Sequence, residues 1–122
     1  MEINWLGRTK MKQITWTEFE DVEIRVGTII QVDNFPEAHK PTYKLKIDLG
    51  KEIGIKNSSA RIVDLYSKKD LLNKKVICVI NFAPKKIGNF VSEVLTTGFY
   101  RDDDKVVLAV PDKDIQCGAK LA

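Results

Sequence analysis

Apolar and polar residues alternate along much of this chain in short runs that predict β-strands. The longest run, residues 23–35, places five residues on one side: Ile24, Val26, Thr28, Ile30 and Val32. A period of two is typical of a strand with one buried face. Gly27 interrupts this run, which predicts either a bend or the close approach of another segment.

Four more strands complete the predicted barrel, at residues 43–48, 53–59, 76–81 and 93–99. In the first of these, Tyr43 is in phase with the apolar residues and is predicted to be buried. Another strand is predicted at residues 106–110, and residues 111–122 are read as a tail.

Two short helices are predicted from their capping signals. Thr15 and Glu18 have the spacing of a capping box, which predicts a helix through Asp21. A second start lies at Ser67, with Leu71 and Leu72 as the apolar side and Asn73 as the stop: six residues of this segment read SKKDLL.

Three strands, a helix and two more strands are the order of an OB-fold. We therefore predict an all-β, five-stranded Greek-key barrel with a short N-terminal helix, a helix between strands 3 and 4, and a C-terminal extension. The 122 residues suit a single domain. Residues 1–10 lack periodicity and are predicted to be a loose leader, with residues 11–122 forming the one OB-fold domain.

The composition narrows the function classes. No apolar run approaches the roughly 20 residues that cross a bilayer, and the N-terminus lacks a signal-peptide core, so we expect cytoplasmic residence without membrane insertion. Cys78 and Cys117 have no partner at metal-ligand spacing, and His39 has no evident catalytic partner. We expect no catalytic residue, no metal and no cofactor, and the chain has no ATP-binding motif.

Positive charge is concentrated in the middle of the chain. The net charge is +3, but residues 40–61 alone carry six Lys or Arg against two acidic residues. In an OB-fold the strand 2–3 face and the 1–2 and 4–5 loops bind ligands. Here the loops are residues 35–42 and 82–90, so the basic excess coincides with the surface that the fold uses for binding. We expect binding rather than catalysis.

The candidate ligand-binding residues lie on these loops and strands. Lys85 and Lys86 either hold acidic groups of a ligand or lie on a solvated loop tip, and the flanking aromatic residues favour binding. Asn81 either orders the loop or contacts ligand, and one or two of the three phenylalanines near the loops are expected to be exposed. The full set is Lys40, Lys44, Lys56, Ser58, Ser59, Asn81, Phe82, Lys85, Lys86, Phe90 and Ser92.

Several ordered blocks carry a family resemblance. VEIRVGTII, FPEAHKPTYKLKIDLG, GIKNSSARI and NFAPKKIGNFVSEVLTTG together resemble the CsaA family of export-related chaperones, a branch of the tRNA-binding OB domains found in some methionyl-tRNA synthetases and in the endothelial monocyte-activating polypeptide. The resemblance implies a homodimer with an apolar, positively charged groove for unfolded or signal-bearing polypeptide. It also implies the secretion ATPase SecA as a partner.

The resemblance leaves two functions open. The tRNA-binding relatives usually have a Ser-x-Gly-Met type sequence where this chain has Ser92-Glu93-Val94-Leu95. Glu93 would oppose a phosphate, which favours the chaperone branch. Our first hypothesis is a non-enzymatic chaperone for polypeptides in export, and the alternative is a structure-selective tRNA-binding protein.

Overall fold

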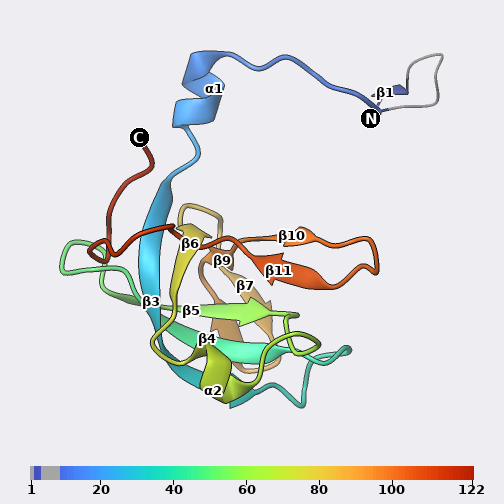
Figure 1. Cartoon of the computed structure of the whole chain (residues 1–122), viewed down its shortest axis with the longest axis vertical. Coiled ribbons are helices and arrows are strands. Elements are labelled where there is room, and N and C mark those ends of the chain that lie inside the picture. Colours follow the sequence, from blue (N-terminus) through green and yellow to red (C-terminus); the bar gives the residue numbers. More distant parts are fainter. Residues whose placement is uncertain (1, 4–8) are drawn as a thin grey trace.

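The main sheet is an antiparallel, five-stranded one, in the order β5–β4–β3–β6–β9. The computed structural model describes residues 2–3 and 9–122 of the chain. The strands are β3 (Ile24–Asn34), β4 (Tyr43–Asp48), β5 (Ile55–Ala60), β6 (Lys75–Val79) and β9 (Leu95–Thr96). The fourth and fifth predicted strands thus pair beside the first, as an OB-fold requires, and the predicted fold is confirmed (Figure 1).

Polar contacts between β5 and β9 bring the two ends of the sheet together. The carbonyl of Asn57 accepts hydrogen bonds from the backbone N–H groups of Glu93 and Val94, at 2.8 and 3.2 Å. The hydroxyls of Ser58 and Thr96 share a hydrogen bond of 2.9 Å in the interior. These contacts nearly close the sheet into a barrel.

The strand β3 contains a bulge that changes which of its residues face the core. The register with β4 shifts between Ile29, which is opposite Ile47, and Gln31, which is opposite Lys46. Ile29 is fully buried, whereas Ile30 is 38% exposed. The alternation predicted for residues 23–35 is therefore wrong before the bulge, where Gly27 and Ile29 rather than Thr28 and Ile30 face the core. Because the bulge inserts one extra residue and reverses the phase, Val32 beyond it packs against the core as predicted.

Gly27 confirms the predicted close approach. A Cβ atom at this position would lie 2.4 Å from Cγ2 of Ile47 and 2.9 Å from Cδ2 of Leu49. Both side chains are fully buried. The core has no room for a side chain at this point, since the side chains of Ile47 and Leu49 pack directly against the glycine.

The core is formed by the inward faces of the barrel strands and by residues just beyond them. Tyr43 is buried as predicted, and its hydroxyl donates to the carbonyl of Tyr66 at 2.9 Å. Burial raises the pKa of the Cys78 thiol to about 12. The cluster consists of Ile29, Tyr43, Leu45, Ile47, Leu49, Ala60, Ile62, Leu71, Val76, Cys78, Val94 and Leu108.

Both predicted helices and their capping boxes are present. α1 (Trp16–Glu20) is capped by Thr15 and Glu18, and α2 (Lys68–Leu71) by Ser67 and Asp70. Asn73 follows α2 with a positive φ of 69°. Leu71 is buried, but Leu72 is 49% exposed, so only one of the two predicted apolar residues reaches the core.

Two hairpins appear where the sequence predicted a loop and a continuous strand. Within the predicted loop 83–90, β7 (Lys85–Ile87) pairs with β8 (Phe90–Ser92) across Gly88, which has a positive φ of 60°. The predicted strand 93–99 is interrupted at Thr97, where β9 ends and β10 (Gly98–Tyr100) leaves the barrel to pair with β11 (Val106–Leu108).

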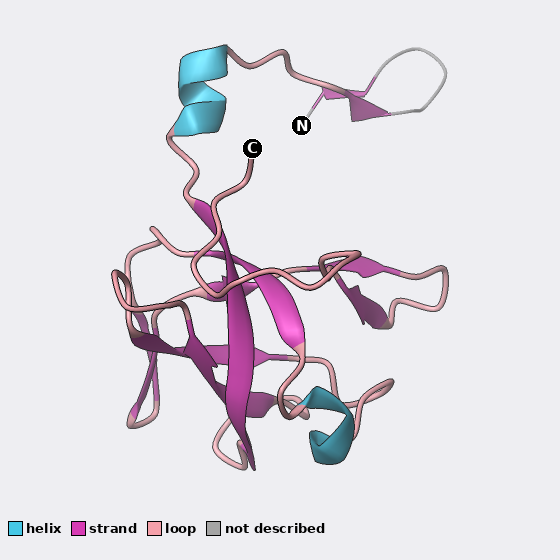
Figure 2. Cartoon of the chain, turned by 60° about the vertical axis from the view of Figure 1, so that its left-hand side comes forward, coloured by secondary structure: helices cyan, strands magenta, loops and turns pink. Residues whose placement is uncertain are grey.

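The two ends of the chain differ in how they meet the barrel. The N-terminal segment stands away from it, with α1 above the end of β3 (Figures 1 and 2). The predicted leader, residues 1–10, lies partly outside the described residues; of it, β1 (Glu2–Ile3) pairs with β2 (Thr9–Lys10).

The C-terminal segment follows β3 instead of forming a free tail. Gly118 N–H donates to the carbonyl of Val26 at 2.7 Å, and Val26 N–H donates to Ala119 at 2.9 Å. Leu121 N–H donates to Ile24 at 3.0 Å. In the part of the chain that the structure describes, no helix has the length and apolar character needed to span a membrane.

Candidate functional site

Two neighbouring hollows lie on the face of the barrel beside β5 and the β7–β8 hairpin. The first, called here the apolar hollow, has a volume of about 340 Å³. Its floor contains Phe82, Val94 and Leu95, and Phe82 and Leu95 are 58% and 46% exposed. Its remaining lining consists of Ser59, Ala83, Lys85, Ser92 and Glu93.

The second hollow has a volume of about 470 Å³ and is called here the basic hollow. It shares Ser59 and Lys85 with the apolar hollow, so the two adjoin at these residues. Four cations line it, Lys40, Arg61, Lys85 and Lys86, against the single carboxylate of Glu37. An apolar surface thus passes directly into a positively charged one.

The β7–β8 hairpin carries the two lysines, and hydroxyl contacts hold it against β5. The Ser92 hydroxyl oxygen accepts from Ser59 N–H at 3.2 Å and lies 3.4 Å from the Ser59 hydroxyl. In the pairing of the hairpin, Lys85 is opposite Ser92. This attachment places Lys85 at the boundary of the two hollows.

A cation over two aromatic rings lies next to the hairpin. Phe35, only 4% exposed, makes an edge-on contact with Phe90 at a centroid distance of 5.3 Å. The Lys44 ammonium lies 5.5 Å from the Phe35 ring and 5.9 Å from the Phe90 ring. Lys44 and Phe90 line a smaller hollow of about 230 Å³, away from the two larger ones.

Glu93 is held in the wall of the apolar hollow by neighbours on β5. One of its carboxylate oxygens accepts from Asn57 N–H at 3.0 Å, and the other lies 3.8 Å from the Lys56 ammonium. The carboxylate is thus fixed in the lining of the apolar hollow, between Asn57 and Lys56.

The structure brings most of the predicted site residues together. Six of them line the two neighbouring hollows: Lys40, Ser59, Phe82, Lys85, Lys86 and Ser92. Lys44 and Phe90 line the separate, smaller hollow. Lys56 is paired with Glu93, and Ser58 is fully buried in its hydrogen bond to Thr96, so its hydroxyl does not reach the surface.

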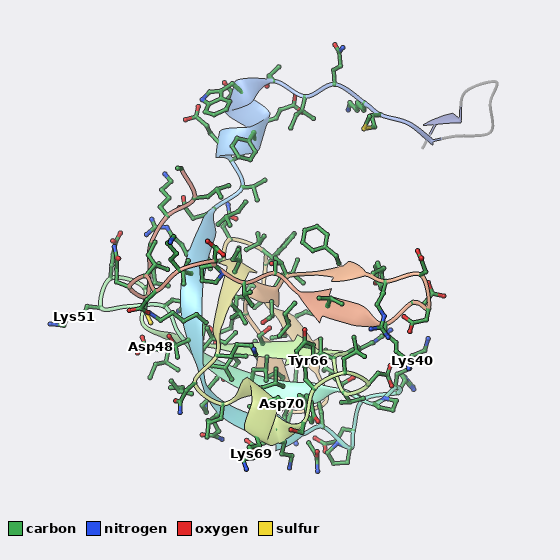
Figure 3. The ribbon with its side chains drawn as sticks, viewed as in Figure 1. Lys40, Asp48, Lys51, Tyr66, Lys69 and Asp70 are labelled. Carbon is green, nitrogen blue, oxygen red and sulfur yellow. The ribbon has the colours of Figure 1, made fainter. Side chains whose placement is uncertain are left out.

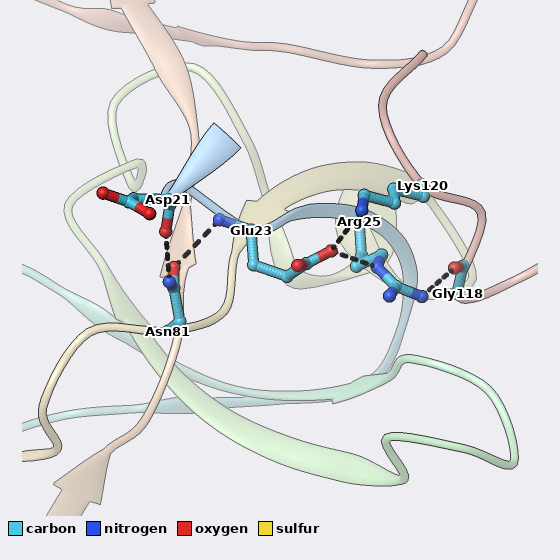
Figure 4. Close-up of polar contacts among 6 residues, drawn as sticks. All are labelled: Asp21, Glu23, Arg25, Asn81, Gly118 and Lys120. Atoms are coloured by element: carbon cyan, nitrogen blue, oxygen red, sulfur yellow. Dashed lines mark hydrogen bonds and ion pairs between the residues drawn. The ribbon is translucent and has the colours of Figure 1, made fainter. Parts of the chain in front are cut away.

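Asn81 lies apart from the hollows and orders the start of the barrel (Figure 4). Its side chain donates to the carbonyl of Asp21 at 2.6 Å and accepts from Glu23 N–H at 3.0 Å. The Glu23 carboxylate in turn accepts from the Arg25 guanidinium at 2.8 Å, which lowers the pKa of Glu23. Arg25 also donates to Gly118, so this network joins α1, β3 and the C-terminal segment.

Sequence reasoning missed Arg61 and Leu95 as site residues. Arg61 belongs to the basic stretch and directly follows β5, so its charge in that stretch was the signal for it. Leu95 was assigned to a barrel strand, and within β9 it faces outward between the buried Val94 and Thr96. Figure 3 shows Lys40 near the outer rim of the molecule, below the tip of the β10–β11 hairpin.

Comparison with known proteins places this geometry in a family. Residues 24–120 match the family described as a putative tRNA binding domain. The crystal structure of the CsaA chaperone protein of Picrophilus torridus is 51% identical, with a TM-score of 0.85, and the match covers 90% of this chain and 100% of that one. The chain belongs to the tRNA-binding-domain family, in its CsaA branch.

Other CsaA-like and synthetase relatives agree. Chaperone CsaA of Bacillus anthracis is 35% identical with a TM-score of 0.85, and the match covers 91% of this chain and 100% of that one. A methionine–tRNA ligase of Pyrococcus furiosus is 36% identical over 94% of this chain. This chain spans only 15% of that ligase's length.

Proposed function

We propose that this CsaA-like protein is a non-enzymatic chaperone that binds extended segments of unfolded or signal-bearing polypeptide in the cytoplasm. The observation that carries the proposal is that the apolar and basic hollows lie side by side and share Ser59 and Lys85 in their linings. A polypeptide offers apolar side chains and charged groups within one short segment. A surface with both characters side by side suits such a ligand.

The binding step follows from the two surfaces. Apolar side chains of the client would pack on Phe82 and Leu95, where burial contributes about 25 cal/mol for each Å² of apolar surface removed from water. Acidic side chains or carbonyl oxygens of the client would face Lys40, Lys85 and Lys86. Long-range attraction by these cations would accelerate encounter with acidic segments.

A homodimer is part of the proposal. The arm that leads to α1 exposes large apolar side chains: Met11 is 87%, Ile14 60% and Trp16 68% exposed. Trp16 packs only loosely against Phe19, at a centroid distance of 5.3 Å. The arm stands off the barrel, and packing against a second copy would remove this surface from water (Figure 2). Two grooves in one particle would raise the effective affinity for a long client.

The second candidate function is tRNA binding, favoured by the family and by the four cations of the basic hollow. The fixed carboxylate of Glu93 in the adjoining apolar hollow argues against a phosphate ligand there. The methionine–tRNA ligase relatives are much longer proteins, so their activity does not extend to this chain by similarity alone.

Fluorescence anisotropy with two labelled ligands separates these functions. A signal-bearing peptide and a tRNA are each titrated at low and near-physiological salt. Polypeptide binding that persists in salt, with tRNA binding weak or lost, is the expected result. Tight tRNA binding that displaces the peptide and falls steeply with salt would transfer the assignment to tRNA, because each phosphate contact contributes about −0.7 to −0.9 to the log–log slope.

A further inference from the structure

A third hollow lies beyond the basic hollow and reaches the β10–β11 hairpin; together with the apolar and basic hollows it is called here the groove. It has a volume of about 400 Å³ and is called here the hairpin hollow. It shares Lys40 and Arg61 with the basic hollow. Tyr100 and Val106 of the hairpin face these two cations across it. The apolar, basic and hairpin hollows therefore form one series.

The hairpin is fixed to the barrel in a way that sets the position of Tyr100. The Tyr66 hydroxyl accepts from Leu108 N–H at 3.0 Å, which ties β11 to the core. At Gly98 a Cβ atom would lie 2.7 Å from the carbonyl oxygen of Val107, so the two strands approach too closely for a side chain there. Tyr100, opposite Val106, is nevertheless 82% exposed. An aromatic ring held by a fixed hairpin and left open to water is a surface for stacking.

Two residues that are two positions apart join the three hollows. Ser59, in β5, lines the first two hollows, and Arg61, the first residue beyond β5, lines the second and third. In an extended backbone, residues two apart lie roughly 6.6 Å from each other. An extended client running along β5 repeats its side chains at the same interval, and could offer successive side chains to successive hollows.

We propose that the hairpin hollow is a third subsite of the groove, which binds an aromatic side chain of a polypeptide whose neighbouring acidic residue occupies the basic hollow. This inference rests on the proposed polypeptide-binding function. The groove then binds client side chains in a fixed order: an apolar side chain beside Phe82, an acidic one among the lysines, and an aromatic one against Tyr100 and Arg61.

The charges along the groove support a polypeptide in this subsite. In the described part of the chain, Lys40, Arg61, Lys85 and Lys86 form no ion pair within the molecule, so the basic hollow has cations available for an acidic client residue. Asp64 and Asp104 line the hairpin hollow, as Glu93 lines the apolar one. Carboxylates at both ends of the basic hollow oppose a continuous row of phosphates but not a peptide with one acidic residue.

The test uses labelled peptides that contain leucine, glutamate and tryptophan in this order, separated by one, two or three serines. Matched peptides carry serine in place of tryptophan. We expect the tryptophan peptide of the best spacing to bind the wild-type protein about 3- to 10-fold more tightly than its serine counterpart. Tyr100→Ala should abolish this difference and leave the affinity for the serine peptide unchanged.

Phe99 provides the matched control, because it neighbours Tyr100, is 71% exposed and lies outside the linings of the three hollows. Phe99→Ala should keep the full preference for tryptophan. A preference for tryptophan that survives Tyr100→Ala overturns the third subsite. In that case, a weaker affinity of Phe82→Ala for both peptides would show that the wild-type protein still binds polypeptide through the apolar hollow. Failure of every peptide to bind the wild type overturns the proposed function as well.

A titration with tRNA distinguishes RNA from polypeptide as the ligand of Tyr100. If Tyr100→Ala weakens tRNA binding and leaves the tryptophan preference intact, the hairpin contacts RNA and the inference is wrong. If Tyr100→Ala weakens only the binding of the tryptophan peptide, the hairpin hollow binds polypeptide.

Discussion

Replacing Gly27 with alanine tests how closely β4 packs over β3. The new Cβ would lie 2.4 Å from Cγ2 of Ile47 and 2.9 Å from Cδ2 of Leu49, whereas ordinary contacts begin near 3.4 Å. Both neighbours are fully buried, so each must move by up to about 1 Å inside a close-packed core. Overpacking of this kind costs about 1–3 kcal/mol.

A smaller effect acts in the opposite direction. Alanine restricts the unfolded chain more than glycine does, which stabilises the protein by about 0.4–1 kcal/mol where the backbone conformation permits it. At the midpoints of these two ranges, the net loss in the free energy of unfolding is about 1.3 kcal/mol. For a chain of this length the melting temperature should fall by roughly 4–8 °C.

Thermal and denaturant unfolding of four proteins measures the contact directly: the wild type, Gly27→Ala, Ile47→Ala and the double variant. Ile47→Ala removes the Cγ2 atom, so the double variant should lose about 1 kcal/mol less free energy of unfolding than the two single variants lose together. A Gly27→Ala variant as stable as the wild type, or strictly additive effects, would refute the close packing.

Three further predictions concern the hairpins and the buried thiol. Tyr66→Phe should lower the free energy of unfolding by about 1–3 kcal/mol, because Leu108 N–H loses its partner in a buried site, and hydrogen exchange should quicken across residues 98–108. Burial raises the pKa of Cys78 to about 12, so a thiol reagent at neutral pH should modify Cys117 in the folded protein and reach Cys78 only after unfolding. Modification of Cys78 in the folded protein as fast as that of Cys117 would contradict its burial. The double variant Lys85→Ala/Lys86→Ala should keep its stability within about 0.5 kcal/mol, since both side chains are exposed, and should bind an acidic peptide several-fold more weakly; unchanged binding would remove these lysines from the site.

The sequence was sufficient for the fold because the signals were local and repeated. Alternating and apolar runs at five strands, one capping box and a second helix start predicted the OB-fold order, and Tyr43 followed the phase of its strand into the core. The bulge after Ile29 was not predictable from that pattern, since Ile29 and Ile30 are equally apolar. The backbone pairing with β4 decides which of the two is buried.

The site was predicted less completely because it depends on contacts between distant segments. The basic stretch and the loop around Lys85 predicted the face on which the two hollows lie, but not the outward position of Leu95 between the buried Val94 and Thr96. Ser58 and Ser59 are adjacent in sequence, yet the first closes the barrel with Thr96 and the second lines both hollows. Only the closure between β5 and β9 separates their roles.

The most direct test of the polypeptide groove is a nuclear magnetic resonance titration of the ¹⁵N-labelled protein with an unfolded, signal-bearing peptide. The account predicts that chemical-shift changes concentrate at residues 37–42, 59–61 and 82–95, which line the apolar and basic hollows. The amides of α2, which lie outside these linings, should change little. Changes centred on α2 or absent from residues 82–95 would contradict the central claim.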